Sequence, residues 1–354
     1  MRVGLTLYGS LDGRSGGFRY DRRLVEELRA AGDTVEVVEL PWRAYGRGLL
    51  DIADPRLRER LDVDVDVMLQ DELAHPSLVG TNRSLPYPTV SVVHHLRADE
   101  QRPLAPFYRA VEARYLDTVD GVVCNSTATC ESVTDLGVDP ERAVVAPPAG
   151  DRFEPDVTSD GIDRRATERP TRIAFVGNVT PRKGLDTLVE GLAAADIDAE
   201  LTVVGRVVDP EHALAVRRAI REHGLGDRVR LRGELSDDGL ADVLRSSHLL
   251  AMPSRHEGFG IAYLEGMRFG LPALASRAGG ATDLVTDGDN GVLVRPDDPA
   301  AVARGLERIA GDPDRLAEMG RAARARAEAH PEWPETVGRV RDLLAEVARP
   351  GVAA

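Results

Sequence analysis

The sequence is nearly without lysine. Its 45 basic residues are 44 arginines and a single lysine, Lys183, and 59 acidic residues give a formal net charge of −14. This acidic excess argues against a nucleic-acid partner, because neutralising phosphates takes clustered basic side chains. It favours a protein adapted to molar salt, where repulsion between surface carboxylates is screened. A lone lysine in such a chain indicates a position where a compact ammonium group is needed.

Cysteine is scarce, and long apolar runs are missing. The two cysteines, Cys124 and Cys130, are too few for a four-cysteine zinc site and do not form a CxxC redox motif, so we expect reduced thiols and no metal. No stretch approaches the roughly 18 consecutive apolar residues of a membrane span. The apolar run at 3–8 is too short for a signal peptide. We therefore expect a cytoplasmic protein.

Aromatic residues make up only 4% of the chain, so its cores must be built mainly from aliphatic side chains. The 354 residues are more than twice the roughly 150 of a typical domain. Hydrophobic residues account for 42%, which is enough for two separate cores and excludes general disorder. The composition predicts two globular domains.

Strands and helices alternate along both halves of the sequence. A strand at 3–8, a helix ending near Gly32 and a strand at 34–40 form a βαβ unit, which predicts a parallel sheet. Further strands of this half are predicted at 65–70, 89–93, 120–124 and 143–147. In the second half they are predicted at 171–177, 199–205, 228–233, 248–254, 272–276 and 291–296.

The polar segment 154–170 separates these halves and is typical of a linker. We predict a domain at 1–160, a second at 161–330 and a C-terminal helix at 331–354 that packs back on the first domain. The fold class is α/β, with two Rossmann-like, doubly wound parallel sheets facing across a cleft. Ligands of such sheets bind outside the carboxyl ends of the strands.

The run PSRHEGFGIAYLEG places Glu257 and Glu265 on either side of a glycine turn that enters a helix. Glycine there allows a phosphate or sugar to approach the main chain, and the free N–H groups at the helix start can bind an anion. The two carboxylates can accept hydrogen bonds from different hydroxyl groups of one ligand. The predicted binding positions in the turn are Gly258, Phe259, Gly260 and Ile261.

A second motif, GNVTPRKGLDTLVEGL, contains Gly177 after a strand and Arg182-Lys183 before a helix. Two cations at a helix N-terminus oppose the helix dipole, whereas a bound anion would reverse that effect. The only lysine of the chain lies here. We therefore predict a phosphate-binding site in which Lys183 is exposed when no ligand is bound.

Two further features lie after strands of the first half. The strand 89–93 ends in His94-His95, and a neutral imidazole at that edge can donate a hydrogen bond to a sugar hydroxyl. Neighbouring residues point to opposite sides of a strand, so only one histidine is expected to face the ligand. Gly16-Gly17 after the first strand either lets a phosphate approach or forms a plain turn, since the full GxGxxG motif is absent.

Together these runs resemble the retaining glycosyltransferases of family 4, which have the GT-B fold. GNVTPRKGLDTL is similar to their phosphate-binding turn, and HEGFGIAYLEGMRFGLP to their E-x7-E motif. The resemblance extends through 276–298 and the tail beginning PEWPET, so it covers the second domain well and the first only loosely.

The resemblance implies transfer of a hexose from a nucleotide diphosphate sugar, such as GDP-mannose or a UDP-hexose, to a hydroxyl group. The anomeric configuration would be retained, and neither a metal nor a cofactor other than the donor would be required. The acceptor would be a glycan or lipid-linked saccharide in cell-surface glycan assembly at the inner face of the membrane, with peripheral membrane contact.

The resemblance also assigns roles to individual residues. Arg182 and Lys183 would bind the diphosphate, Glu265 the ribose, and Glu257 with nearby amides the sugar. His94 would lie beside the transferred sugar, with His95 the less favoured candidate. The turn after the strand 228–233 would lie near the base, through Arg232, Gly233 and Glu234.

Two positions depart from the usual pattern of the family. Asn178 stands where arginine is common, so Arg182 would have to supply that charge, and Thr282-Asp283 replaces Pro-Glu. Other functions on the same fold remain open. They are a nucleotide-sugar epimerase, a glycan phosphorylase and a non-catalytic nucleotide-sugar-binding protein. A phosphorylase would need a lysine for pyridoxal phosphate, and Lys183 lies in the wrong motif for that role.

Overall fold

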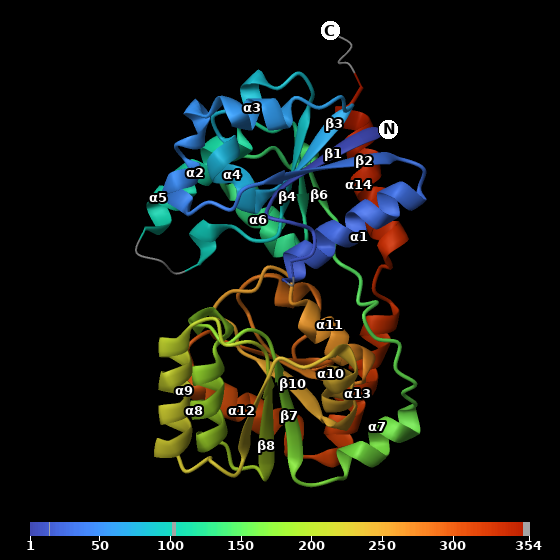
Figure 1. The fold of residues 1–354 in the computed structure, drawn as a ribbon. Coiled ribbons are helices and arrows are strands. Elements are labelled where there is room, and N and C mark those ends of the chain that lie inside the picture. Colours follow the sequence, from blue (N-terminus) through green and yellow to red (C-terminus); the bar gives the residue numbers. More distant parts are fainter. Residues whose placement is uncertain (14, 101–103, 350–354) are drawn as a thin grey trace. The chain divides into compact units, whose positions relative to one another are not determined.

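The computed structural model describes residues 1–13, 15–100 and 104–349, which form two compact units. The first comprises Met1–Ala149 and the segment from Pro331, and the second comprises Gly150–His330. In each unit helices flank a parallel sheet (Figure 1). The chain passes from one unit to the other at 149/150, before the boundary at 160 set from the sequence.

The first unit contains six parallel strands in the order β2-β1-β3-β4-β5-β6. They are β1 (Arg2–Tyr8), β2 (Thr34–Leu40), β3 (Val67–Asp71), β4 (Thr89–Val93), β5 (Gly121–Cys124) and β6 (Ala143–Val145). Every residue of the central strands β3 and β4 is buried, as expected where helices cover both faces of a sheet.

The described residues of this unit form the helices α1 (Gly16–Ala30), α2 (Tyr45–Gly48), α3 (Pro55–Leu61), α4 (His75–Leu78), α5 (Ala105–Leu116), α6 (Thr127–Asp135) and α14 (Trp333–Val347). Short 3-10 turns join them: η1 (Asp51–Ala53), η2 (Glu72–Ala74), η3 (Asn82–Ser84), η4 (Arg97–Asp99) and η5 (Pro140–Arg142). α14 packs on α1, where the buried Trp333 meets the ring of Tyr20 edge-on at 5.3 Å.

The second unit has six parallel strands in the order β12-β11-β10-β7-β8-β9. They are β7 (Thr171–Val176), β8 (Ala199–Val204), β9 (Val229–Gly233), β10 (Leu249–Met252), β11 (Ala273–Ser276) and β12 (Gly291–Val294). The two sheets confirm the predicted α/β fold, and all twelve strands lie where the sequence pattern predicts them.

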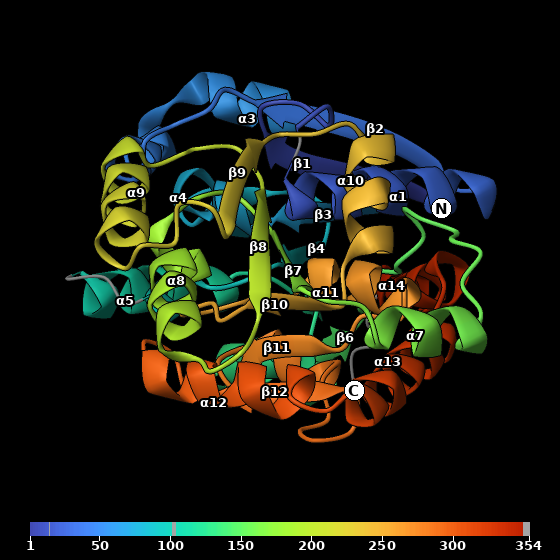
Figure 2. The ribbon, with the colours of Figure 1, turned by 90° about the horizontal axis from the view of Figure 1, so that it is seen from below.

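Helices lie on both sides of this second sheet, with α8 and α9 on one side and α10 and α11 on the other (Figure 2). Its helices are α7 (Ser159–Ala166), α8 (Leu185–Ala194), α9 (Pro210–Glu222), α10 (Asp237–Ser246), α11 (Ile261–Arg268), α12 (Pro299–Ala310) and α13 (Pro313–Glu328). Two 3-10 turns, η6 (Pro181–Lys183) and η7 (Gly280–Asp283), precede α8 and follow β11.

The helix α7 corrects the prediction of a linker over 154–170. Thr158 caps this helix by accepting a hydrogen bond from the N–H of Gly161, and Ile162 and Ala166 are buried. Ile162 fits against glycines of the second unit, since a Cβ at Gly270 would lie 2.5 Å from its Cδ1. Two apolar residues four positions apart are enough to dock one helical turn, although most of the segment is charged.

Candidate functional site

The second sheet has a topological switch point between β7 and β10. These strands are neighbours, but the chain continues from β7 to β8 and β9 on one side and from β10 to β11 and β12 on the other. Gly177 follows β7 directly, and the loop 253–257 follows β10. Doubly wound sheets bind ligands at such a point. Both glycine-containing motifs therefore begin where a ligand is expected.

An ion pair joins the two motifs at this edge. Lys183 Nζ lies 2.6 Å from Glu257 Oε2, and Ser254 donates a hydrogen bond of 3.1 Å to the same oxygen. Arg182 Nη1 lies 3.9 Å from that oxygen and also donates to the carbonyl of His256 at 2.9 Å. Two cations thus surround one carboxylate, so these three side chains carry a net positive charge.

The surroundings of Glu257 keep it ionised. Burial alone would raise the pKa of this carboxyl, but the charges of Lys183 and Arg182, with hydrogen bonds from Lys183 and Ser254, lower it to about 2. Burial also lowers the pKa of Lys183, and the charge of Glu257 opposes that effect. The pair is therefore a salt bridge at neutral pH, stabilised by the opposite charges of its members.

The prediction that Lys183 is exposed is wrong. Its side chain is only 13% exposed, because the ammonium is directed at Glu257 and the aliphatic part packs beside Gly177. An anion that binds here must compete with Glu257 for the ammonium group. Such exchange of one anionic partner for another leaves Lys183 neutralised in both states.

Gly184 brings the Arg182-Lys183 turn against the loop after β10. It has φ +68, in the left-handed region, and a Cβ at this position would lie 2.2 Å from the carbonyl oxygen of Pro253. Any other residue would push the two loops apart. This glycine therefore explains how the two motifs come within ion-pair distance.

The turn Gly258-Phe259-Gly260 leads into α11, and Gly260 caps that helix without a side-chain hydrogen bond. Phe259 is buried and contacts the ring of His330 at 5.7 Å, so its side chain is part of the core. What Phe259, Gly260 and Ile261 can offer a ligand is their backbone N–H groups at the positive end of α11. Their ligand-binding role stays a prediction.

Glu265 lies in α11 and is buried. Its Oε2 is 3.6 Å from Nη1 of Arg152, which also pairs with Asp237 at 2.6 Å. Glu265 is held within a charged network rather than directed freely at solvent. Arg152 could not be predicted from the sequence pattern, because it lies far from α11 in the chain and no motif surrounds it.

The remaining residues predicted for the second domain are more scattered. Arg232 is an exposed residue of β9, the outermost strand, and two strands separate it from the β7–β10 switch point. Thr282 and Asp283 lie in η7, whose first residue, Gly280, donates a backbone hydrogen bond to the carbonyl of Glu257. The loop of Thr282-Asp283 is therefore adjacent to the ion pair, whereas Arg232 is not joined to it.

In the first unit, His94 directly follows β4 and lies within a cluster of acids. Its Nε2 lies 3.3 Å from Oδ1 of Asp21 in α1, and its backbone N–H donates to Glu72 at 3.1 Å. Burial alone would lower the pKa of His94, but the hydrogen bond and charge of Asp21, with the charges of Asp71 and Glu72, raise it to about 9. His95 turns away and contacts Glu100 at 3.1 Å.

Gly16 and Gly17 open α1, which Ser15 caps by accepting a hydrogen bond from the N–H of Phe18. A Cβ at Gly17 would lie 3.0 Å from Cδ2 of His94 and 3.3 Å from Nε2. Glycine at this position thus leaves room for the imidazole. Phosphate binding by the N–H groups of this turn stays a prediction.

The acids around His94 were not among the predicted site residues. Asp71 and Glu72 directly follow the buried run VMLQ, and the end of a parallel strand is a signal that the pattern offered. Asp21 had no such signal, since an acidic residue inside an amphipathic helix is usually solvated. Here it is fully buried.

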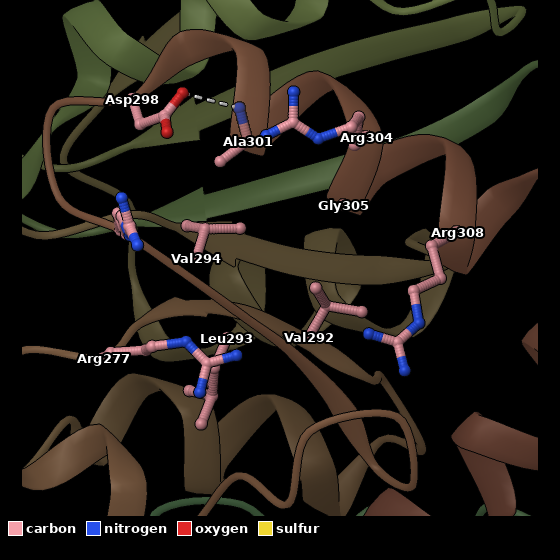
Figure 3. Close-up of a pocket in the computed structure, with 10 residues that line it drawn as sticks. Arg277, Val292, Leu293, Val294, Asp298, Ala301, Arg304, Gly305 and Arg308 are labelled. Carbon is pink, nitrogen blue, oxygen red and sulfur yellow. Dashed lines mark hydrogen bonds between the residues drawn. The ribbon is translucent and has the colours of Figure 1, made fainter.

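A separate hollow of about 400 Å³ lies beside β12 and α12 (Figure 3). Arginines surround it, and Arg304 and Arg308 of α12 lie over the strand, with Arg277 on the other side. Asp287 lies within 3.5 Å of Arg277 and Arg308. The hollow is lined by none of the residues that the two motifs predict, so the switch point is the better candidate for the donor site.

Comparison with protein families finds two matches. Residues 162–326 match the family "Glycosyl transferases group 1", and residues 14–152 match "Glycosyltransferase Family 4". Together the matches span both units. No helix in the described part of the chain combines the length and apolar character needed to cross a membrane.

Curated relatives carry the name D-inositol 3-phosphate glycosyltransferase. The one from Gordonia bronchialis is 31% identical over 274 residues, covering 71% of this chain and 59% of the relative. The one from Corynebacterium efficiens is 30% identical over 301 residues, covering 78% of this chain and 68% of the relative. The chain spans about six tenths of the length of several such relatives.

Solved structures share the whole fold. Sucrose-phosphate synthase from Thermosynechococcus elongatus has a TM-score of 0.81 and 22% identity, with 98% of both chains covered. Anabaena HepE in complex with UDP-glucose has a TM-score of 0.78 and 17% identity, covering 98% of this chain and 100% of that one. These likenesses confirm the GT-B type of fold.

Proposed function

Because this chain belongs to the group 1 glycosyl transferases of the family 4 type, we propose that it transfers a hexose from a nucleotide diphosphate sugar to an acceptor hydroxyl. The observation that carries this proposal is the meeting of Arg182, Lys183 and Glu257 at the β7–β10 switch point. The transfer retains the anomeric configuration and needs neither a metal ion nor a further cofactor.

The positive charge at this point suits a diphosphate leaving group. A phosphate about 4 Å from either cation gains on the order of 4 kcal/mol before desolvation, at an effective dielectric constant near 20. The same cations stabilise the negative charge that develops on the diphosphate as the glycosidic bond breaks. Lys183 and Arg182 therefore act both in binding and in catalysis.

The donor is a UDP-hexose or GDP-mannose. The complex of Anabaena HepE with UDP-glucose supports a UDP-sugar by likeness of fold. Glu265 holds the ribose, Glu257 and the amides at the start of α11 hold the sugar, and His94 lies beside the transferred hexose. These roles rest on family resemblance and on where each residue lies relative to its sheet.

We place the acceptor among glycans or lipid-linked saccharides of cell-surface glycan assembly, at the cytoplasmic face of the membrane. Support comes from the first unit, whose exposed large hydrophobic side chains in the described residues all lie in 42–52 and 104–107. The two segments meet where Tyr45 contacts Phe107 at 6.2 Å. Trp42, Leu50, Ile52, Leu104 and Phe107 are each 46–62% exposed.

A polar acceptor is the second candidate, because the curated relatives are named for D-inositol 3-phosphate. A phosphorylated cyclitol would not use an apolar surface. Replacing Leu50 and Phe107 should therefore slow transfer to a lipid-linked acceptor but not transfer to a phosphorylated cyclitol.

The test is turnover in molar KCl with EDTA, using UDP-glucose, UDP-N-acetylglucosamine, UDP-galactose and GDP-mannose against soluble and lipid-linked acceptors. We expect one donor to react, with the product anomer seen by NMR matching the donor. The double variant Leu50→Ser/Phe107→Ser should slow transfer to a lipid-linked acceptor about tenfold. Leu214→Ser, which replaces an exposed leucine of the second unit, serves as the control.

Three results contradict parts of this proposal. Binding of a donor without transfer to any acceptor favours a non-catalytic binding protein. Full activity on inositol phosphate or soluble sugars, with none on lipid-linked saccharides, excludes the membrane role. Inversion of the anomer excludes a retaining mechanism.

A further inference from the structure

Four ionisable side chains meet at the carboxyl ends of β3 and β4. Asp21, Asp71 and His94 each place one side-chain nitrogen or oxygen within 4.8 Å of the others, and all three are buried. Glu72, the neighbour of Asp71, accepts the backbone N–H of His94. In the described part of the chain, no lysine or arginine is paired with these acids. The imidazole is thus the cluster's single basic group.

Two of the acids, Asp21 and Asp71, lie side by side: one carboxylate oxygen of each is within 4.8 Å of the other. The Oδ2 atom of each is buried and has no hydrogen-bond partner among the described residues. Two carboxylates this close disfavour each other's ionisation.

Asp71 and Glu72 are weaker acids than ordinary carboxyl groups. Burial and the neighbouring charge of Asp21 raise the pKa of Asp71 to about 7, and burial together with Asp71 keeps the pKa of Glu72 well above its usual range. Of the acids in the cluster, Asp21 is the one whose side chain contacts the imidazole of His94, at 3.3 Å.

The contact with Asp21 also distinguishes the two nitrogens of the His94 ring. Nε2 donates to Oδ1 of Asp21, whereas Nδ1 has no hydrogen-bond partner in the described residues. Other contacts hold the residue without touching a ring nitrogen: Tyr20 packs edge-on at 5.3 Å, and Asn125 donates to the His94 carbonyl at 2.8 Å. Asp21 alone fixes which nitrogen remains for a ligand.

We propose that Asp21 is the positioning residue of His94, holding Nε2–H so that Nδ1 presents a proton to an oxygen atom of the sugar substrate. This inference rests on the proposed glycosyl transfer, because it assigns how His94 is prepared for that reaction. Asp21 itself touches no substrate.

The test is nitrogen NMR of 15N-histidine-labelled protein, which reports the protonation of His94 without any turnover. In the wild-type chain His94 should carry protons on both nitrogens at pH 7.5 and lose one as the pH rises through about 9. Asp21→Asn should lower the proton affinity of His94 at least tenfold, since an amide supplies no negative charge.

Asp71→Asn is the matched variant at the neighbouring position. Asparagine keeps an oxygen that can accept the N–H of Leu73, which donates to Asp71 at 3.0 Å, but it removes the charge of Asp71. We expect this variant to lower the proton affinity of His94 by less than Asp21→Asn does, because Asp71 acts on the imidazole through its charge alone, whereas Asp21 also forms a hydrogen bond with the ring. The resonances of His95 report whether the neighbouring loop remains folded in either variant.

Kinetics supply a second readout. Asp21→Asn should lower kcat at least tenfold while the dissociation constant for the nucleoside diphosphate is unchanged, and Asp21→Glu should recover part of the loss. If the wild-type enzyme transfers no sugar, the proposed function fails, but the NMR titration still decides the Asp21–His94 relationship.

Three outcomes overturn the inference. The first is a neutral His94 in the wild-type protein at pH 7.5. The second is an unchanged His94 titration in Asp21→Asn, and the third is a pKa of His94 that falls as far in Asp71→Asn as in Asp21→Asn. Stoichiometric broadening of His94 by Mn²⁺, reversed by EDTA, would instead make the cluster a cation site. If Asp21→Asn fails to fold, the wild-type titration and Asp71→Asn still decide.

Discussion

The only lysine of the chain, Lys183, donates a hydrogen bond of 2.6 Å to Glu257, and both residues are largely buried. The first lies after β7 and the second after β10, so one contact joins the two loops of the switch point. The pair keeps a positive group and a negative group in place before any ligand binds.

Removing either partner of this pair should destabilise the fold, because the other charge is then buried alone. We expect Lys183→Ala and Glu257→Gln each to lower the free energy of unfolding, and the decrease should be about 3 kcal/mol for the lysine variant. In the double variant the free energy of unfolding should fall by clearly less than the sum of the two single decreases. Urea unfolding of all four proteins measures the coupling, and simple additivity would show that the charges do not interact.

The pair should also make stability depend on pH in the acid range. The pKa of Glu257 is about 2 in the folded chain and 4.5 without its neighbours, so the unfolded chain binds the proton more readily. The stabilisation is therefore complete above about pH 4.5 and is lost as the pH falls towards 2.

This contribution is of the order of 3 kcal/mol, since each pKa unit corresponds to about 1.4 kcal/mol. Urea unfolding should show that the free energy of unfolding falls less between pH 6 and pH 3 for Glu257→Gln than for the wild type. An equal decrease in the two proteins would mean that Glu257 has an ordinary pKa.

Glu265 and His94 should separate donor binding from turnover. Glu265→Gln removes a charged hydrogen-bond acceptor for the ribose, so the dissociation constant of the donor should rise about 10- to 100-fold. His94→Ala should leave that constant unchanged and lower kcat about 100-fold or more. Calorimetry and steady-state kinetics together measure both effects, and the opposite pattern would show that the two roles are exchanged.

Gly17 should be intolerant of a side chain although it lies in a loop-to-helix turn. Gly17→Ala places a Cβ about 3.0 Å from Cδ2 of His94, so the imidazole must shift. We expect kcat to fall several-fold with donor affinity unchanged. Gly46→Ala, in α2 with nothing within 4 Å of the added Cβ, is the control. Equal activity of both variants would show that His94 tolerates a side chain at position 17.

The sequence pattern predicted the strand framework because parallel strands are continuous apolar runs bounded by turns. It also predicted the two motif loops, since glycines and cations at strand ends are local features. It could not predict that Lys183 is buried, because the partner that neutralises it lies 74 positions away. The same limit hid Asp21 and Arg152, whose partners come from distant elements.

The measurement that tests the account most directly is calorimetric binding of UDP and GDP to the wild type, Lys183→Ala and Arg304→Ala in molar KCl. Arg304 lines the arginine hollow beside β12 and is the matched cationic control. We predict that Lys183→Ala weakens binding of the preferred diphosphate at least tenfold and that Arg304→Ala leaves it unchanged. Unchanged affinity in Lys183→Ala, or a loss confined to Arg304→Ala, would contradict a diphosphate site at the β7–β10 switch point.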